Sequence, residues 1–281
     1  MNPAEPPVRD RPDGGQPVNF DPIAGQYDQT RGGLGWGRLM ASFVAPLMPA
    51  GPLLEVGVGT GLVASALDEL GRRPVGVDLS AAMLAHAAAR VPGRLARADA
   101  RRLPVRSGSV AGVYLVHVLH LVGDVDHCLA QVARVLRPGG VLVTTAGTPE
   151  RPERPERPER PARPEWSDVD HVVRALRREL GLDQADGIAP DDETRVTALA
   201  GRHGLRLTDR QIVERTGLGA TPTDMADRVA DRSWSWMWMA PEQVWVAAAS
   251  RALEGLRALP DPGRIRPATS REPVLVFGKV S

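Results

Sequence analysis

One glycine-rich segment, Glu55-Val-Gly-Val-Gly-Thr-Gly61, constrains the fold of this chain more than any other stretch. It follows a short apolar run, LLEV, and precedes LVASALDELG, whose apolar spacing predicts a helix ending at Gly71. Gly57, Gly59 and Gly61 let the backbone approach a ligand closely, and the following helix presents its free N–H groups at the same place. The segment therefore predicts a strand, turn and helix with a ligand site at the carboxyl edge of a sheet.

Strands and helices alternate through the region that surrounds this segment. The runs PVGVDLS, RLARADA, SVAGVYLVHVL and VLVTTAG have strand character. Between them lie two helical patterns, SAAMLAHAAARV, which Ser80 can cap, and DHCLAQVARVL, which Gly139 and Gly140 can terminate. This order predicts a parallel sheet with right-handed crossovers, and hence a doubly wound α/β fold.

The second half of the chain departs from this regular alternation. Residues 149–165 repeat Pro-Glu-Arg, and proline at every third position excludes a helix or a central strand because proline lacks the N–H that both need. We interpret the repeat as a hydrated spacer. Helical patterns near 168–181, 191–203 and 222–259 surround a sixth predicted strand, LRLTDRQIVER, and PVLVFGKV predicts a seventh.

The predicted fold is a Rossmann-like α/β sheet of seven mostly parallel strands, the last of them antiparallel, with a helical cap after strand five and between strands six and seven. The predicted organisation is a disordered leader and one domain, divided as follows: leader 1–18, domain 19–281, cofactor-binding core 51–148, repeat spacer 149–165, and cap segments 166–190 and 221–260.

Composition narrows the class of protein. Of the 281 residues, 42% are hydrophobic and 25% are charged, and the formal net charge is +1, which is typical of a soluble globular chain and argues against a nucleic-acid partner. No apolar run is long enough to span a membrane, and no secretory signal is visible. Cys128 is the single cysteine, so an internal disulfide and a cysteine-built metal site are excluded. We expect a cytoplasmic protein without a metal or a membrane partner, and its oligomeric state stays open.

The ligand of the glycine segment has two candidate classes. Asp78 ends the second predicted strand about twenty residues on, where a carboxylate can accept both hydroxyls of a ribose. A dinucleotide site favours G-x-G-x-x-G, and Leu62 occupies the position of its last glycine. The spacing G-x-G-x-G after an acidic residue instead resembles that of class I S-adenosylmethionine-dependent methyltransferases. A tight turn without a ligand is the structural alternative.

An ordered set of further motifs strengthens the resemblance. The blocks VGVDLSAAML, ARADARRLP and LRPGGVLV follow in sequence, and FDPIAGQYDQTRG precedes the first strand. Together they are similar to those of the ubiquinone/menaquinone-biosynthesis-like branch, methyltransferase type 11, over roughly residues 19–147. Val110-Ala111 stands where this branch usually has Phe-Asp, and Val58 stands where cysteine is common.

The resemblance implies a cofactor, S-adenosyl-L-methionine, and a role for each matching residue. The glycines would line its methionine part, with Glu55 ordering their loop. Asp78 would bind the ribose, while Asp99 and the Ala100 N–H would bind the adenine. The remaining implied contacts are Leu79 and Met83 against the adenine, Val116 and His117 beside the sulfonium, and Tyr27 and Arg31 closing over the cofactor.

Methyl transfer from a sulfonium chiefly requires alignment, and a general base matters only for a neutral hydroxyl or a carbon acid. His117 and His120, in VHVLHLV, are the catalytic candidates, and we expect replacing either to lower turnover within about tenfold, because alignment dominates. The tryptophans of SWSWMWMAPEQVW either anchor the cap to the core or line an acceptor pocket. On an α-helix, Trp234 and Trp238 would share one face and Trp236 would point elsewhere.

The favoured function is methylation of a small-molecule acceptor, with secondary-metabolite biosynthesis as its setting. One alternative is a nicotinamide-dependent oxidoreductase on a related sheet, which Leu62 and the lack of a Tyr-x-x-x-Lys pair disfavour. The other is a catalytically silent protein that binds S-adenosylmethionine and uses its arginine-rich repeat for partner contact.

Overall fold

The computed structural model describes residues 20–21, 24–25, 27–28, 32–147, 167–182, 189, 191–215, 219–238, 240–268 and 270–280. The predicted leader, Arg31 and the Pro-Glu-Arg repeat lie outside the described residues.

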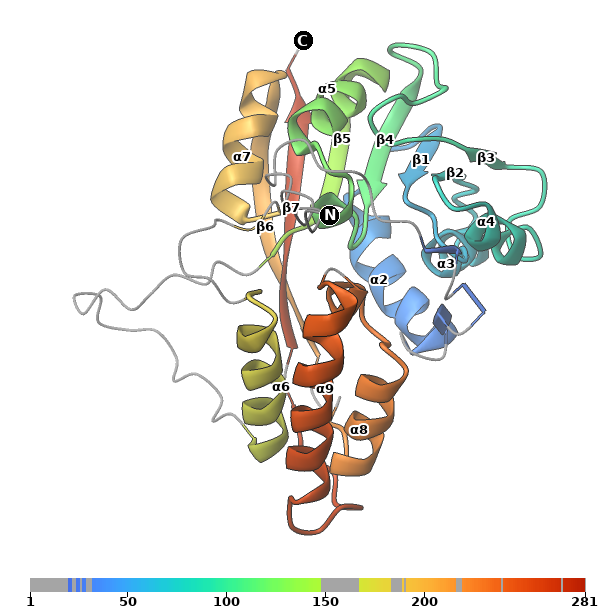
Figure 1. The fold of residues 1–281 in the computed structure, drawn as a ribbon. Helices are drawn as coiled ribbons and strands as arrows, with labels where there is room; N and C mark the ends of the chain where they lie inside the picture. Colours follow the sequence, from blue (N-terminus) through green and yellow to red (C-terminus); the bar gives the residue numbers. More distant parts are fainter. Residues whose placement is uncertain are drawn as a thin grey trace, which may run out of the picture.

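Within the described residues, seven strands form one sheet in the order β3-β2-β1-β4-β5-β7-β6 (Figure 1). Neighbouring strands from β3 to β5 are parallel, whereas β7 is antiparallel to both β5 and β6. The predicted doubly wound sheet with an antiparallel last strand is therefore confirmed. The strands are β1 (Leu53–Val56), β2 (Val75–Asp78), β3 (Leu95–Arg97), β4 (Val110–Leu115), β5 (Leu136–Thr145), β6 (Leu205–Arg215) and β7 (Ser270–Lys279).

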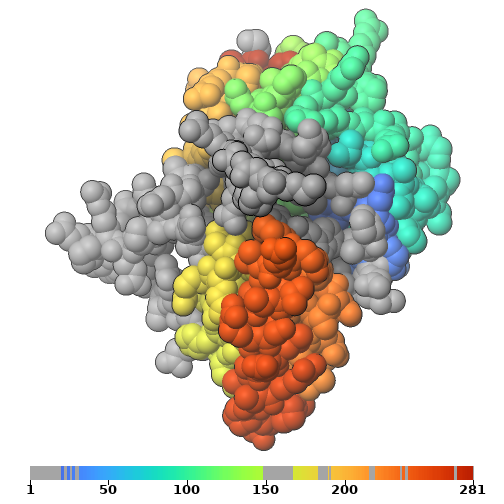
Figure 2. Space-filling model, in the orientation of Figure 1, coloured from blue at the N-terminus to red at the C-terminus, as the bar shows by residue number. Residues whose placement is uncertain are grey.

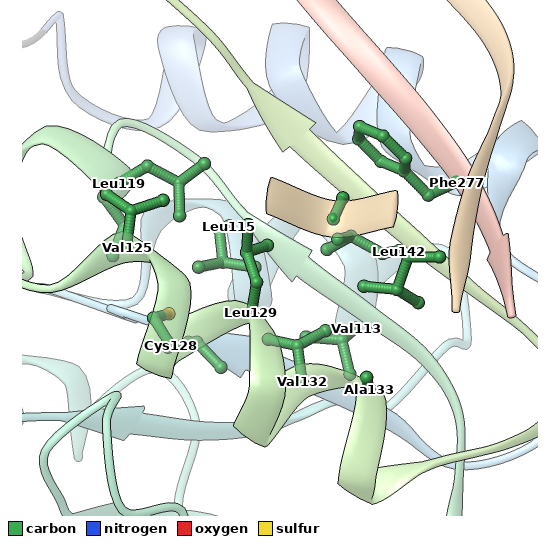
Figure 3. Packing of buried hydrophobic residues seen from close by; sticks show 14 of the residues in the cluster. Val113, Leu115, Leu119, Val125, Cys128, Leu129, Val132, Ala133, Leu142 and Phe277 are labelled. Atoms are coloured by element: carbon green, nitrogen blue, oxygen red, sulfur yellow. The ribbon is translucent and has the colours of Figure 1, made fainter. Parts of the chain in front are cut away.

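Helices cover both faces of the sheet because successive side chains of each strand point to opposite faces. On β4, Val113 and Leu115 pack in the cluster that contains α5 and α7, while Tyr114 packs with α2 and α3 on the other face. Figure 3 shows the first cluster, with Leu142 and Phe277 of the sheet beside Leu129 and Val132 of α5. The flanking helices are α2 (Gly33–Leu47), α3 (Leu62–Glu69), α4 (Ala81–Ala87), α5 (Val125–Val135) and α7 (Glu193–Arg202).

A second apolar core lies outside the sheet. Helices α6 (Asp168–Glu179), α8 (Pro222–Ala230) and α9 (Glu242–Arg257), with the short 3-10 helix η3 (Ser235–Trp238), bury Leu176, Val229, Met237 and Trp245 among themselves. These helices lie beyond the lower ends of β6 and β7 in Figure 1, and α9 forms much of the outer surface of this layer in Figure 2. We call α6, α8, η3 and α9 the cap.

One sequence expectation is wrong. Gly139 and Gly140 do not terminate α5, because this helix already ends at Val135 and both glycines lie in β5. The physical reason is Pro138: the proline ring disfavours helical backbone at the residue before it, so the chain is extended from Leu136 onward. Ser80 does cap α4, since its hydroxyl accepts the N–H of Met83.

Among the helices of the described residues, none has the length and apolarity to cross a membrane.

Candidate active site

A pocket opens at the carboxyl ends of β1, β2 and β4. The strand order reverses between β1 and β4, and in open α/β sheets this switch point is where ligands bind. The pocket encloses about 680 Å³ of space when its open mouth is counted. Its wall is formed by Phe20, Tyr27, Val56, Gly57, Gly59, Val77, Asp78, Leu79, Met83, Ala98, Asp99, Ala100, Val116, His117, Val118, Leu121 and Val122.

The sequence-predicted site residues divide into two groups. Those that line the pocket are Tyr27, Gly57, Gly59, Asp78, Leu79, Met83, Asp99, Ala100, Val116 and His117. Glu55, Gly61 and His120 do not line it, and Arg31 lies outside the described residues. Segments far apart in the sequence therefore meet in one cavity, as the resemblance implies.

The first glycine of the segment is required by space as well as by conformation. Gly57 has a φ of 75°, and a Cβ built there would lie 2.4 Å from Cγ2 of Val118. Gly61, with a φ of 80°, is the N-cap of α3. The loop therefore holds its backbone against the pocket where a side chain would collide, and α3 begins directly behind it.

Glu55 lies beneath the loop rather than in the pocket. Its side chain is buried, and the Tyr114 hydroxyl donates to its carboxyl group over 2.9 Å. The backbone N–H of Ala64, in the first turn of α3, donates to the same carboxyl group. Burial, with a smaller contribution from the charge of Asp78, raises the pKa of Glu55 from 4.5 to about 8. Glu55 is therefore protonated at neutral pH and links β1, β4 and α3.

Asp78 both lines the pocket and clamps the loop. One carboxylate oxygen accepts the N–H of Gly59 over 2.8 Å, and the other accepts the N–H of Ser80 over 2.9 Å. Burial raises the pKa of Asp78, and these backbone N–H groups partly oppose that increase. A carboxylate has about four acceptor sites, so capacity remains for the donors of a ligand.

Asp99 has a charged neighbour that the sequence motif did not reveal. Arg101 donates to both carboxylate oxygens, with Nη2 2.7 Å from Oδ2. This hydrogen bonding lowers the pKa of Asp99. Asp99 is thus an ionised acceptor at the pocket wall, held by the arginine two residues further on.

The N-terminal segment is tied to the glycine loop by residues that sequence reasoning missed. Asp28 accepts from the Thr60 hydroxyl and from Arg90, whose guanidinium also donates to the Thr60 carbonyl. Asp21 accepts from the Ser80 hydroxyl and the Ala82 N–H at the start of α4. The only signal in the sequence was the position of these two aspartates beside the aromatic residues of FDPIAGQYD.

Two of those aromatic residues line the pocket. The rings of Phe20 and Tyr27 meet edge to face, with centroids 6.0 Å apart. Tyr27 was predicted to close over the cofactor, whereas Phe20 was not identified. Their contact therefore forms an aromatic part of the pocket wall.

The two candidate histidines have different surroundings. His117 lines the pocket, and its Nε2 lies 3.1 Å from Oε1 of Glu272. His120 lies in η2 (Leu119–Leu121), with Nδ1 3.3 Å from Oδ2 of Asp191, and is not part of the pocket wall. The structure therefore separates two residues that the sequence could not distinguish.

The tryptophans of the cap do not follow the helical geometry expected for them. Residues 235–238 form a 3-10 helix, and the rings of Trp234 and Trp236 stack with centroids 5.8 Å apart. The guanidinium of Arg177 from α6 lies 5.3 Å from the Trp236 ring centroid. These contacts lie within the cap, and Trp234, Trp236 and Trp245, the tryptophans of this segment with described side chains, do not line the pocket.

Comparison with known proteins assigns the central part of the chain. Residues 54–144 match the family model described as "Methyltransferase domain". The chain is also 34% identical over 149 residues to demethylmenaquinone methyltransferase of Parafrankia sp. (strain EAN1pec), covering 44% of this chain and 59% of that relative. Residues 54–144 are an S-adenosylmethionine-dependent methyltransferase domain. A second relative, demethylmenaquinone methyltransferase of Mycolicibacterium gilvum (strain PYR-GCK), is 36% identical over 129 residues, and the chain spans somewhat more than half the length of each of these two relatives.

Solved structures show the same fold at low sequence identity. YcgJ protein of Bacillus subtilis superposes with a TM-score of 0.55 at 17% identity, covering 88% of this chain and 98% of that one. Phosphoethanolamine N-methyltransferase 2 of Haemonchus contortus, in complex with S-adenosyl-L-methionine, has a TM-score of 0.52 at 18% identity, covering 93% of this chain and 58% of that one. At these identities the likeness extends to the fold alone.

Proposed function

We propose that this protein transfers the methyl group of S-adenosylmethionine to a small-molecule acceptor. The observation that carries the proposal is the convergence of ten motif residues on one pocket at the switch point of the sheet. The methyltransferase domain supports the class of donor, and the pocket supports a ligand of small-molecule size.

The residues present suit the chemistry of that donor. Gly57 brings bare backbone to the pocket wall, and the ionised Asp99 and the partly satisfied Asp78 offer acceptors for amino and hydroxyl groups. Leu79 and Met83 line the same pocket and provide apolar surface for a planar ring. Bound there, S-adenosylmethionine would supply an activated methyl group, so the protein needs mainly to align the acceptor with it.

The acceptor would enter from the side of His117 and Val116, which follow β4. The Parafrankia relative is named for a quinone precursor, which supports a small organic acceptor for this chain as well. We assign the acceptor to secondary metabolism because the cap lies entirely outside the matched residues 54–144 and gives this chain its own covering layer. A cytoplasmic setting is supported by the single cysteine of the sequence, Cys128, which is a buried free thiol.

The test is direct binding followed by product detection. Calorimetry on the full chain should show saturable binding of S-adenosylmethionine and S-adenosylhomocysteine, and none of NAD. Incubation with methyl-labelled S-adenosylmethionine and a metabolite extract should then place the label in a small molecule. Binding of NAD without S-adenosylmethionine would refute the proposal, whereas cofactor binding without any labelled product would leave a silent binding protein.

A further inference from the structure

His117 is held in a conformation that a histidine rarely adopts. Its φ is 57°, in the left-handed region that is strained for a residue with a side chain. Its backbone N–H donates to Oγ1 of Thr145 at the end of β5, over 2.8 Å. Backbone strain of this kind is concentrated at functional sites, where surrounding contacts maintain it.

The imidazole ring of His117 contacts two further side chains. It stacks on Trp36 of α2, with ring centroids 5.6 Å apart and an angle of 29° between the planes. Its Nε2 faces Glu272 of β7, which is largely buried with 12% of its side chain exposed. Three separate elements, α2, β5 and β7, therefore converge on one histidine at the pocket wall.

The carboxylate determines which ring nitrogen is available. A carboxylate can only accept, so Glu272, with Oε1 3.1 Å from Nε2, favours the tautomer that carries its proton on Nε2 and its lone pair on Nδ1. Among the described residues, no hydrogen bond or ion pair is found for Nδ1. His120 has the opposite arrangement, because its Nδ1 faces Asp191 and it does not line the pocket.

We propose that Glu272 positions His117 as the general base for a hydroxyl acceptor, an alcohol or a phenol. The inference rests on the proposed methyl transfer and names its substrate class. The acceptor O–H proton moves to Nδ1 while the acceptor oxygen bonds to the methyl carbon. The carbon–sulfur bond breaks with its electron pair remaining on sulfur. Methyl ether, S-adenosylhomocysteine and an imidazolium paired with Glu272 result, and the imidazolium returns its proton to water.

The chemistry of the acceptor explains why such a pair is needed. A neutral amine attacks through its own lone pair and can lose its proton afterwards, so it gains little from a base. A neutral hydroxyl is a weak nucleophile until its proton is removed, and a positioned base typically contributes 10²–10⁴-fold. For His117 we therefore expect a larger loss of turnover than the tenfold expected from the sequence alone.

The positioning role can be tested without an acceptor. In ¹⁵N-histidine-labelled full-length protein, we expect His117 at about pH 8 to carry its proton on Nε2, with that proton protected from exchange with water. Glu272→Leu should abolish the protection. If leucine disturbs folding, the conservative Glu272→Gln variant serves instead, and it should keep only part of the protection. Glu214→Gln, on exposed β6, is the matched control and should change nothing. A proton on Nδ1, or protection unchanged in both Glu272 variants, would overturn the inference.

The acceptor class is tested by the labelled product. We expect a methyl ether, a 10²–10⁴-fold loss of kcat in His117→Asn, and a loss of about tenfold or more in Glu272→Gln, with S-adenosylmethionine affinity within threefold of the parent in both. An N-methyl or S-methyl product, or unchanged kcat in both variants, would refute the base while leaving the methyltransferase function intact. Failure to bind S-adenosylmethionine at all would instead refute the proposed function.

Discussion

Replacing Glu55 by glutamine should change how the stability of this protein depends on pH. Burial raises the pKa of Glu55 from 4.5 to about 8, so the folded protein holds a proton that the unfolded chain releases. The resulting stability is fully present below pH 4.5 and is lost as the pH rises through 8.

The size of the effect follows from the shift. A difference of about 3.5 pKa units corresponds to about 5 kcal/mol, the full effect of this one group from acid to alkaline pH. Between pH 6 and pH 8 the loss is about 2 kcal/mol, which lowers the melting temperature by about 4–8 °C in a chain of this length. The amide oxygen of glutamine offers two acceptor sites for the Tyr114 hydroxyl and the Ala64 N–H, but glutamine does not ionise.

Thermal or urea unfolding of the parent and the Glu55→Gln protein at several pH values between 6 and 9 measures how the free energy of unfolding of each depends on pH. We expect the Glu55→Gln protein to lose about 2 kcal/mol less than the parent between pH 6 and pH 8. Glu254→Gln, on the exposed surface of α9, is the control and should follow the parent. Parallel pH profiles for the parent and Glu55→Gln would show that Glu55 is ionised in the folded state, contrary to this reasoning.

Four further outcomes are expected. Asp78→Ala should weaken S-adenosylmethionine binding by about tenfold to a few hundredfold, because it removes charge-assisted hydrogen bonds and the clamp on the glycine loop. Calorimetry on the folded variant measures this affinity, and an unchanged value would contradict the role assigned to Asp78. Gly57→Ala should cost about 2–4 kcal/mol in urea unfolding, since its Cβ meets Val118 and its φ is positive, and a loss below 1 kcal/mol would show that the loop relaxes easily. His120→Asn should lower turnover by less than tenfold, and a thousandfold loss would mean that this histidine reaches the acceptor. A shorter Gly/Ser linker in place of Glu150–Glu165 should leave folding, cofactor affinity and turnover within about threefold, and selective loss of turnover would make the repeat part of the site.

The sequence by itself determined the sheet and the position of the cofactor pocket. Apolar residues recur with different periods in strands and helices, so the elements of the sheet could be located from the sequence. A glycine turn between a buried strand and a helix lies at the carboxyl edge of the sheet, so the place of Gly57 and Asp78 at the pocket was predictable from local spacing. The end of α5 was mispredicted because two glycines outweighed Pro138, although both signals are local.

Only the tertiary structure decided which histidine faces the pocket. His117 and His120 share one short motif, and their difference comes from partners 155 and 71 residues further along the chain, Glu272 and Asp191. Those partners are brought to the carboxyl edge by β7 and by the loop before α7, and no local pattern encodes that meeting. When distant strands pair, they place charged side chains beside one another, and no periodic pattern in the sequence records that contact. The choice of His117 over His120 as the proposed base therefore required the tertiary structure.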